Sequence, residues 1–115
     1  MTLFEDLPIY RDTYKITSLI VDYTNDFPKL YKYTIGSRMV DTSISLFEYI
    51  SLAARSKSNK EQRNEYISSF IFKFEQLKVL IRLCNEKKII SLKQSAQLAE
   101  LTASIGKQAA GWKDS

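Results

Sequence analysis

The feature that most constrains the fold is a stretch of 69 residues, 37–105, that contains neither glycine nor proline. Glycine reaches positive φ freely, and proline removes a backbone donor and clashes inside helices, so these two residues mark most turns and breaks. Within this stretch apolar residues recur every three or four positions, which predicts helices joined by short polar turns. The pattern argues against a β-sandwich and against a glycine-rich phosphate-binding loop.

Four segments show this helical spacing, and we expect helices at about 8–25, 30–54, 59–87 and 91–109. Asp6 before Pro8 predicts the first helix start, and Ser58 and Ser91 each precede a Glu or Gln by three positions, as in a capping box. Gly36 indicates either a close helix contact or a late helix start. The short connections predict an all-α protein, an up-down-up-down four-helix bundle formed by residues 1–115 as one domain.

Each segment has an inner apolar stripe that predicts the core. The stripes are Ile9, Thr13, Ile16, Ile20, Tyr23 and Phe27; Ile35, Met39, Thr42, Leu46, Ile50 and Ala53; Tyr66, Phe70, Phe74, Leu77, Ile81 and Cys84; and Leu98, Leu101, Thr102 and Ile105. Further apolar residues flank these stripes, namely Ile44, Phe47, Tyr49, Ile71, Phe72, Val79 and Leu80. This surplus predicts either a second buried surface between subunits, hence a homo-oligomer, or ordinary scattered surface apolar residues.

Composition removes several classes of function. The chain has no histidine, which excludes Ser-His-Asp and Cys-His catalysis and imidazole metal sites, so we expect no metal and no cofactor. Its one cysteine, Cys84, lies in a core stripe and is expected to be a small buried residue. No run is long enough to span a membrane, and the acidic N-terminus (MTLFEDLP) does not resemble a signal peptide. We therefore expect a cytoplasmic protein.

The charge is unevenly distributed, with −3 on residues 1–26 and +7 on residues 27–115. Such an excess suits a polyanion such as RNA or DNA, although a solvated basic surface without a partner would look the same. Glu75 and Glu86 lie within one helical turn of bases and can offset some of this charge. The candidate nucleic-acid or partner-binding residues are Lys29, Lys32, Arg38, Lys78, Arg82, Lys87, Lys88, Lys93 and Lys107.

Aromatic residues near these bases have two interpretations each. Tyr31 and Tyr33 are interleaved with Lys29 and Lys32, so they are expected either to pack or to stack on bases. Trp112 follows Gly111 near the end of the printed sequence. Gly111 could stop the last helix so that Trp112 folds over the end of the bundle, or Trp112 could anchor a partner.

Three stretches carry a resemblance to a known family: residues 27–36 (FPKLYKYTIG), residues 77–84 (LKVLIRLC), and residues 90–94 (ISLKQ) leading to 105–112 (IGKQAAGW). In this order they resemble the accessory variability determinant proteins of diversity-generating retroelements, which belong with the ribosomal RNA intervening-sequence proteins in a group of four-helix bundles. The resemblance runs from about residue 7 to residue 113. Arg82 matches the family's third-helix Arg, and Gly106, Lys107, Gly111 and Trp112 match its C-terminal motif.

The resemblance implies a homopentamer of four-helix bundles that binds template RNA or other nucleic acid and the element's reverse transcriptase. It implies a non-catalytic partner in mutagenic reverse transcription, and no catalytic residue can be transferred. The alternative is an intervening-sequence-type scaffold for protein interaction that does not bind nucleic acid. An enzyme with paired carboxylates such as Glu48 and Glu75 would lack the Glu-x-x-His motif of di-metal bundles.

Overall fold

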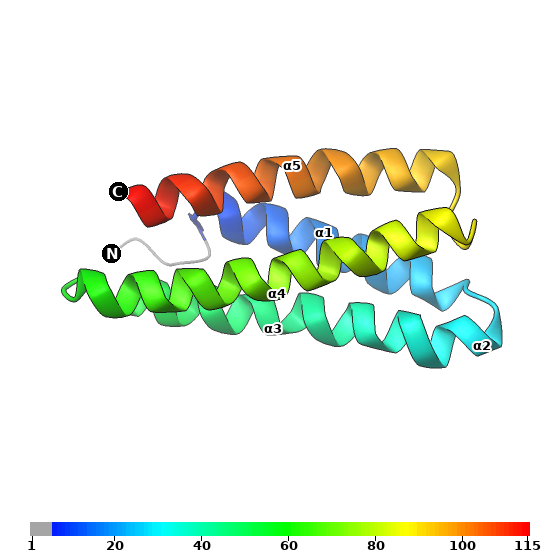
Figure 1. Cartoon of the computed structure of the whole chain (residues 1–115), viewed down its shortest axis with the longest axis horizontal. Helices are drawn as coiled ribbons and strands as arrows, with labels where there is room; N and C mark the ends of the chain where they lie inside the picture. Colours follow the sequence, from blue (N-terminus) through cyan, green and yellow to red (C-terminus); the bar gives the residue numbers. More distant parts are fainter. Residues whose placement is uncertain (1–5) are drawn as a thin grey trace.

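The computed structural model describes residues 6–115 and confirms the all-α prediction. Four long helices run up, down, up and down along a body of 46 × 23 × 23 Å, and no strand occurs among the described residues (Figure 1). Residues 1–5 of the acidic N-terminus, Glu5 among them, lie outside this range. The long helices are α1 (Pro8–Asn25), α3 (Ser37–Arg55), α4 (Lys60–Glu86) and α5 (Leu92–Asp114), and the short elements α2 (Lys29–Tyr31) and η2 (Lys32–Gly36), a π-helical turn, join α1 to α3.

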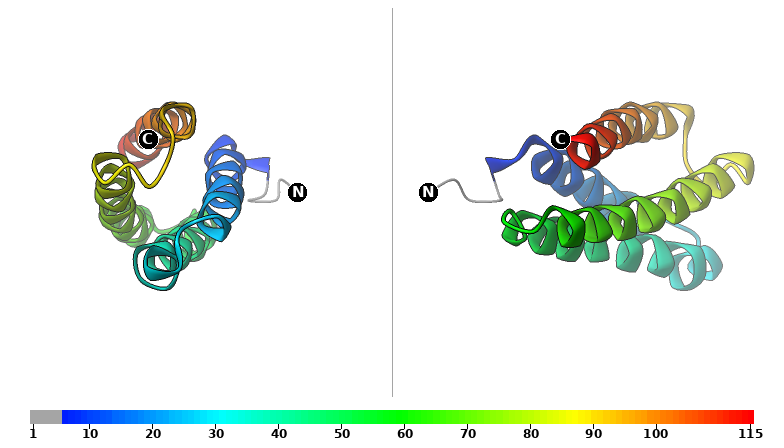
Figure 2. Two further views of the ribbon diagram at one scale, coloured as in Figure 1. Left: turned by 90° about the vertical axis from the view of Figure 1, so that its right-hand side faces the viewer. Right: turned by 60° about the vertical axis from the view of Figure 1, so that its left-hand side comes forward.

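The helices form a closed ring of neighbours when the bundle is seen along its axis (Figure 2). α1 packs against α3 and α5, and α4 packs against the same two helices from the other side. The α3–α4 pair makes the most extensive contact. Because sequential helices are antiparallel, the α1–α3 connection and the α4–α5 turn lie at the same end of the bundle (Figure 1).

Most residues of the predicted stripes form the core, but Tyr23, Ile35, Leu101 and Thr102 are only half-buried. Ser43 is buried where Thr42 was expected, and Ile67 is buried while Tyr66 is half-exposed. Both predictions are wrong by one position, which corresponds to about 100° around the helix. The largest fully buried side chains are Phe70, Phe74, Ile16, Ile20, Met39, Leu46, Ile50, Ile67, Leu77, Leu98, Ile105 and Thr13.

The helix ends correct three predictions. Leu7, rather than Asp6, is the N-cap of α1, and no side chain caps it. Asn59, rather than Ser58, caps α4 by accepting a hydrogen bond from the Gln62 N–H at 3.0 Å. α5 continues to Asp114, so Gly111 lies inside the helix and does not end it.

The capping box at Ser91 is confirmed. The Gln94 N–H donates to the Ser91 side chain, and the Ser91 N–H donates to the Gln94 side chain, both at 3.0 Å. Two of the orphan N–H groups at the start of α5 are therefore satisfied. This fixes where the α4–α5 turn ends and where α5 begins.

Gly36 shows why the second predicted helix is not regular. It is buried in η2, where a Cβ would lie 3.2 Å from the Tyr31 carbonyl oxygen and 3.3 Å from Thr24 Cβ. The close-contact interpretation of Gly36 is thus confirmed, and the late helix start is confirmed as well, because α3 begins only at Ser37. Only a residue without a side chain lets the end of α1 and the start of α3 approach this closely.

Candidate nucleic-acid interface

Seven of the nine predicted basic residues lie on segments that meet at one end of the bundle (Figure 1). We call this the connection end, formed by residues 26–38 and 82–93. It carries seven basic and two acidic residues, a net charge of +5. Lys32 is half-exposed and the other six bases are exposed. These seven residues are Lys29, Lys32, Arg38, Arg82, Lys87, Lys88 and Lys93.

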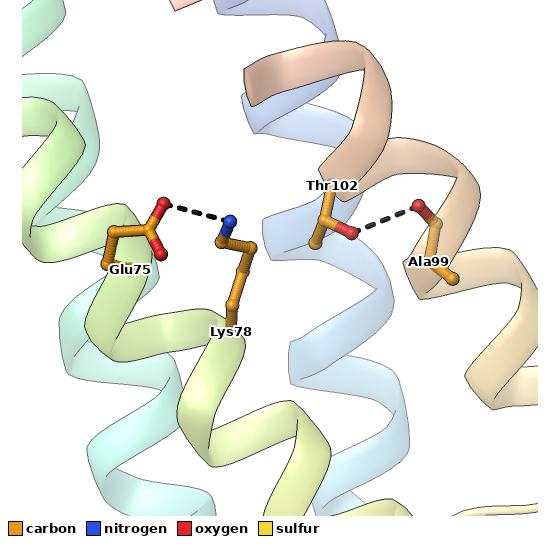
Figure 3. Close-up of polar contacts among 4 residues, drawn as sticks. All are labelled: Glu75, Lys78, Ala99 and Thr102. Carbon is orange, nitrogen blue, oxygen red and sulfur yellow. Dashed lines mark hydrogen bonds and ion pairs between the residues drawn. The ribbon is translucent and has the colours of Figure 1, made fainter. Parts of the chain in front are cut away.

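Lys78 lies apart from the connection end, on the side of α4 that faces α5. Its ammonium is 2.8 Å from the Glu75 carboxylate and 5.4 Å from the centre of the Phe74 ring. Figure 3 shows the pair opposite Thr102, whose hydroxyl donates to the Ala99 carbonyl of α5. The offset by Glu75 that the sequence predicts is therefore confirmed, and Lys78 already has an anionic partner within the chain.

Arg82 and Lys107 stand in different surroundings. Arg82 lies 3.8 Å from Glu86, and both side chains are mostly exposed, so this ion pair contributes little to stability. Lys107 is exposed on the last turns of α5, near the opposite end of the bundle. Trp112 is half-buried and packs against the core from within α5, so it does not fold back after a helix stop at Gly111 as one interpretation expects.

Apolar side chains are also exposed at the connection end. Leu30 is 71 % exposed, Tyr33 is 68 % exposed and Leu92 is 87 % exposed. Tyr31 differs from Tyr33, because Tyr31 is half-buried and packs against the core. The structure thus separates two tyrosines that the sequence alone could not distinguish.

The π-helical turn places Tyr33 between two hollows. One, of about 540 Å³, is lined by Tyr33, Arg38 and Leu80 among others, and the second, of about 400 Å³, is lined by Tyr33 and Lys32. Asp41 lines both hollows. The arrangement supplies cations for phosphate groups and an aromatic face for stacking.

Sequence reasoning missed a second basic group at the opposite end, formed by residues 6–11, 55–63 and 107–115. It has seven basic and three acidic residues, a net charge of +4. Arg63 is half-buried there and donates from Nη2 to the Ser115 carbonyl oxygen at 2.7 Å. The high density of Lys and Arg in residues 55–63 is the sequence signal that could have revealed this group.

A polar cluster between α1 and α5 was also missed. The Asp12 carboxylate accepts hydrogen bonds from the Ser104 hydroxyl at 2.8 Å and from the Gln108 amide at 2.6 Å. Farther along the same pair of helices, the Tyr23 hydroxyl donates to the Gln97 side chain. Burial, with a smaller contribution from Asp22, raises the pKa of Tyr23. These bonds make the α1–α5 contact partly polar.

Cys84 is fully buried, as the sequence predicts, and its thiol donates to Met39 Sδ at 3.4 Å. Burial raises its pKa to about 11. A thiol with so high a pKa is almost entirely protonated near neutral pH and is a poor nucleophile.

Two further findings concern residues 6–115. Among them, no three His, Cys, Asp or Glu side chains come together in a way that could hold a metal ion. Nor does any of the described helices combine the length and the apolarity needed to cross a bilayer.

These observations define the class of protein: an all-α, four-helix bundle with a basic connection end. The bAvd-like family model matches residues 8–115, so the chain belongs to the bAvd-like family. bAvd is the accessory variability determinant of diversity-generating retroelements. No curated protein and no solved structure matches the chain significantly.

Proposed function

We propose that this protein is a non-catalytic accessory factor of a diversity-generating retroelement, acting in the cytoplasm. In this role it binds the template RNA, or other nucleic acid, and the element's reverse transcriptase during mutagenic reverse transcription. Family membership supports the role in the retroelement. The observation that carries nucleic-acid binding is the exposure of Leu30, Tyr33 and Leu92 among the seven bases of the connection end. Clustered cations attract phosphates and release counterions, and an exposed aromatic ring can stack on bases.

Binding of labelled template-like RNA to the purified protein tests this function. We expect affinity to fall steeply between about 50 and 200 mM salt, since phosphate contacts dominate such binding. Co-purification with the reverse transcriptase of the same retroelement tests the second partner. An affinity for RNA that is absent at 50 mM salt would remove nucleic acid from the proposal.

The assembly proposed with this function is a homo-oligomer, a pentamer by family resemblance. It is supported by a partly exposed aromatic surface between α1 and α3. There the ring of half-buried Phe47 lies 5.2 Å from that of half-buried Tyr10 and 6.3 Å from that of Tyr14, which is 62 % exposed. Ile44 is 53 % exposed on α3 of the same surface. Phe72, on α4, is 63 % exposed. Apolar surfaces on different helices suit the head-to-tail contact that closes a ring.

Light scattering on the purified chain tests the assembly. Ile44→Asp places a charge on the α1–α3 surface, and we expect it to dissociate the oligomer while the helical content of the chain is kept. Glu100→Lys, which changes charge at an exposed site on α5 and so outside the α1–α3 surface, is the control. A wild-type chain that is monomeric at all concentrations would overturn the proposed assembly.

A second candidate function is a protein-interaction scaffold that does not bind nucleic acid. The same aromatic surface favours it, because exposed apolar groups of this kind mark interaction sites. A closed oligomer that captures the reverse transcriptase but shows no salt-sensitive RNA binding would support the scaffold over the accessory factor.

A further inference from the structure

Tyr33 is held away from the core by the backbone around it. It lies in η2, and three residues later Gly36 is buried against Thr24 and Phe27. The Thr34 hydroxyl donates to the Leu30 carbonyl at 2.6 Å within the same segment. The turn is therefore fixed with Gly36 inward and with Tyr33 68 % exposed.

The larger hollow beside Tyr33 has the features of a base-binding groove. We call it the Tyr33 groove, and it measures about 540 Å³. Half-buried Ile35 and Leu80 supply apolar lining, while Arg38 supplies a cation that can reach a phosphate. On the other side of the Tyr33 ring, Lys32 Nζ lies 6.0 Å from the ring centre.

The charge of the groove is balanced, because Asp41 lines it together with Arg38. Phosphate attraction alone therefore gives this groove little advantage over the rest of the connection end. Stacking on an aromatic ring does not depend on net charge, and every base has a face that can stack. Bases in a duplex have both faces covered by their neighbours, whereas unpaired bases can be splayed out onto aromatic side chains.

We propose that the Tyr33 groove holds an unpaired base of a single-stranded nucleic acid, stacked on Tyr33 beside Leu80, with its phosphates contacted by Arg38 and Lys32. This inference rests on the proposed nucleic-acid binding and adds the form of the ligand. Phosphate contacts by the lysines of the connection end provide the salt-dependent part of the affinity. Tyr33 provides a salt-independent part that acts on single strands.

Fluorescence anisotropy with a labelled 20-nucleotide unstructured RNA and with the duplex of the same sequence tests this proposal. We expect Tyr33→Ala to weaken single-strand binding about tenfold, the usual size of one lost base–aromatic stack. The slope of log affinity against log salt and the duplex affinity should remain unchanged. Tyr33→Phe keeps the stacking face and should bind like the wild type.

Leu92→Ala is the matched control, because it removes an exposed apolar side chain from the same end without removing an aromatic face. It should alter single-strand affinity less than twofold. A 2-aminopurine base in the RNA gives an independent readout, since its fluorescence should be quenched by the wild type and by Tyr33→Phe but not by Tyr33→Ala.

Three results would overturn the inference. Tyr33→Ala could bind single strands like the wild type, or it could lose single-strand and duplex binding equally. It could also keep RNA binding but no longer bind the reverse transcriptase, which would show that the groove binds a protein. Failure of the proposed function is distinct, because then the wild-type chain binds neither form of RNA at 50 mM salt.

Discussion

The connection end and the opposite end carry almost the same charge, +5 and +4, but they differ in what accompanies that charge. At the connection end, Leu30, Tyr33 and Leu92 are exposed among the bases. At the opposite end, the aromatic residues Tyr10 and Trp112 are half-buried and pack against the core, and Arg63 donates a hydrogen bond to the Ser115 carbonyl oxygen. The comparison teaches that net charge does not distinguish a candidate interface here, whereas exposed apolar groups beside free cations do.

The largest expected effect comes from removing positive charges from the connection end, with the opposite end as the control. Replacing Lys29, Lys32, Lys87 and Lys88 by Gln should weaken RNA binding at 100 mM salt by at least about tenfold. Each lost phosphate contact should also lower the salt slope by about 0.7 to 0.9. Anisotropy titrations at several salt concentrations measure both quantities.

The control removes four positive charges from the opposite end by replacing Arg55, Lys57, Lys60 and Lys113 with Gln. We expect this variant to bind RNA within about threefold of the wild type, because the aromatic residues at that end, Tyr10 and Trp112, are half-buried and pack against the core. Equal losses from the two quadruple variants would break the comparison and indicate diffuse electrostatic binding.

Gly36→Ala tests how tightly the connection end is built. The new Cβ would meet the Tyr31 carbonyl oxygen at 3.2 Å, and this backbone atom cannot move without disturbing η2. We expect the free energy of unfolding to fall by about 1–3 kcal/mol, as for other overpacked sites. Urea unfolding followed by circular dichroism measures this free energy. A variant as stable as the wild type would show that the turn can shift to make room for the new Cβ.

Cys84, which is buried at the connection end, makes the free energy of unfolding depend on pH. The thiol has a pKa of about 11 in the folded chain but about 8.5 when unfolded. Between these values the unfolded chain releases a proton that the folded chain keeps, so the free energy of unfolding falls as pH rises. We expect about 1–2 kcal/mol less stability at pH 10 than at pH 8 from this residue.

Urea unfolding of the wild type and of Cys84→Ala at both pH values isolates this effect. The alanine variant is less stable overall but should lack this part of the pH dependence. Parallel pH profiles for the two proteins would mean that the Cys84 thiol ionises equally easily in the folded and the unfolded chain.

The smallest expected effect is at the opposite end, where Gly111 lies inside α5. A Cβ there would meet nothing within 4 Å, in contrast to Gly36. We expect Gly111→Ala to stabilise the chain by about 0.5–1 kcal/mol, the usual gain over glycine within a helix. Thermal unfolding measures the gain, and a loss of stability would contradict the open surroundings of Gly111.

Much of the fold could be predicted because helical periodicity records which face is buried. The stripes of α1, α3 and α4 and the capping box at Ser91 depend on local spacing, and the structure reproduces them with one-position errors at Tyr23, Thr42 and Tyr66. The end of α5 could not be predicted in this way. Gly111 is a strong stop signal locally, but the packing of Trp112 against the core lets the helix continue.

The basic residues of the candidate site could be predicted from the sequence, but their arrangement in space could not. Runs of Lys identified the bases of the connection end, because charge is visible in a sequence. Which tyrosine is exposed depends on a π-helical turn, whose winding requires tertiary contacts at Gly36 that no local pattern shows. Likewise, the basic group of the opposite end becomes visible only when residues 55–63 and 107–115 are brought together by folding.

The π-helical turn has a consequence for tolerance to changes in length. A π-turn holds more residues per turn than the α-helix that follows it, and each α-helical residue corresponds to about 100° of rotation. Deleting one residue from 32–36 would let regular winding resume into α3 without altering the register of that helix against α4. The same deletion would leave Lys29 and Leu30 in nearly their present directions around the axis, because a π-turn that loses one residue becomes an α-turn, so the extra residue changes the winding of residues 32–36 alone.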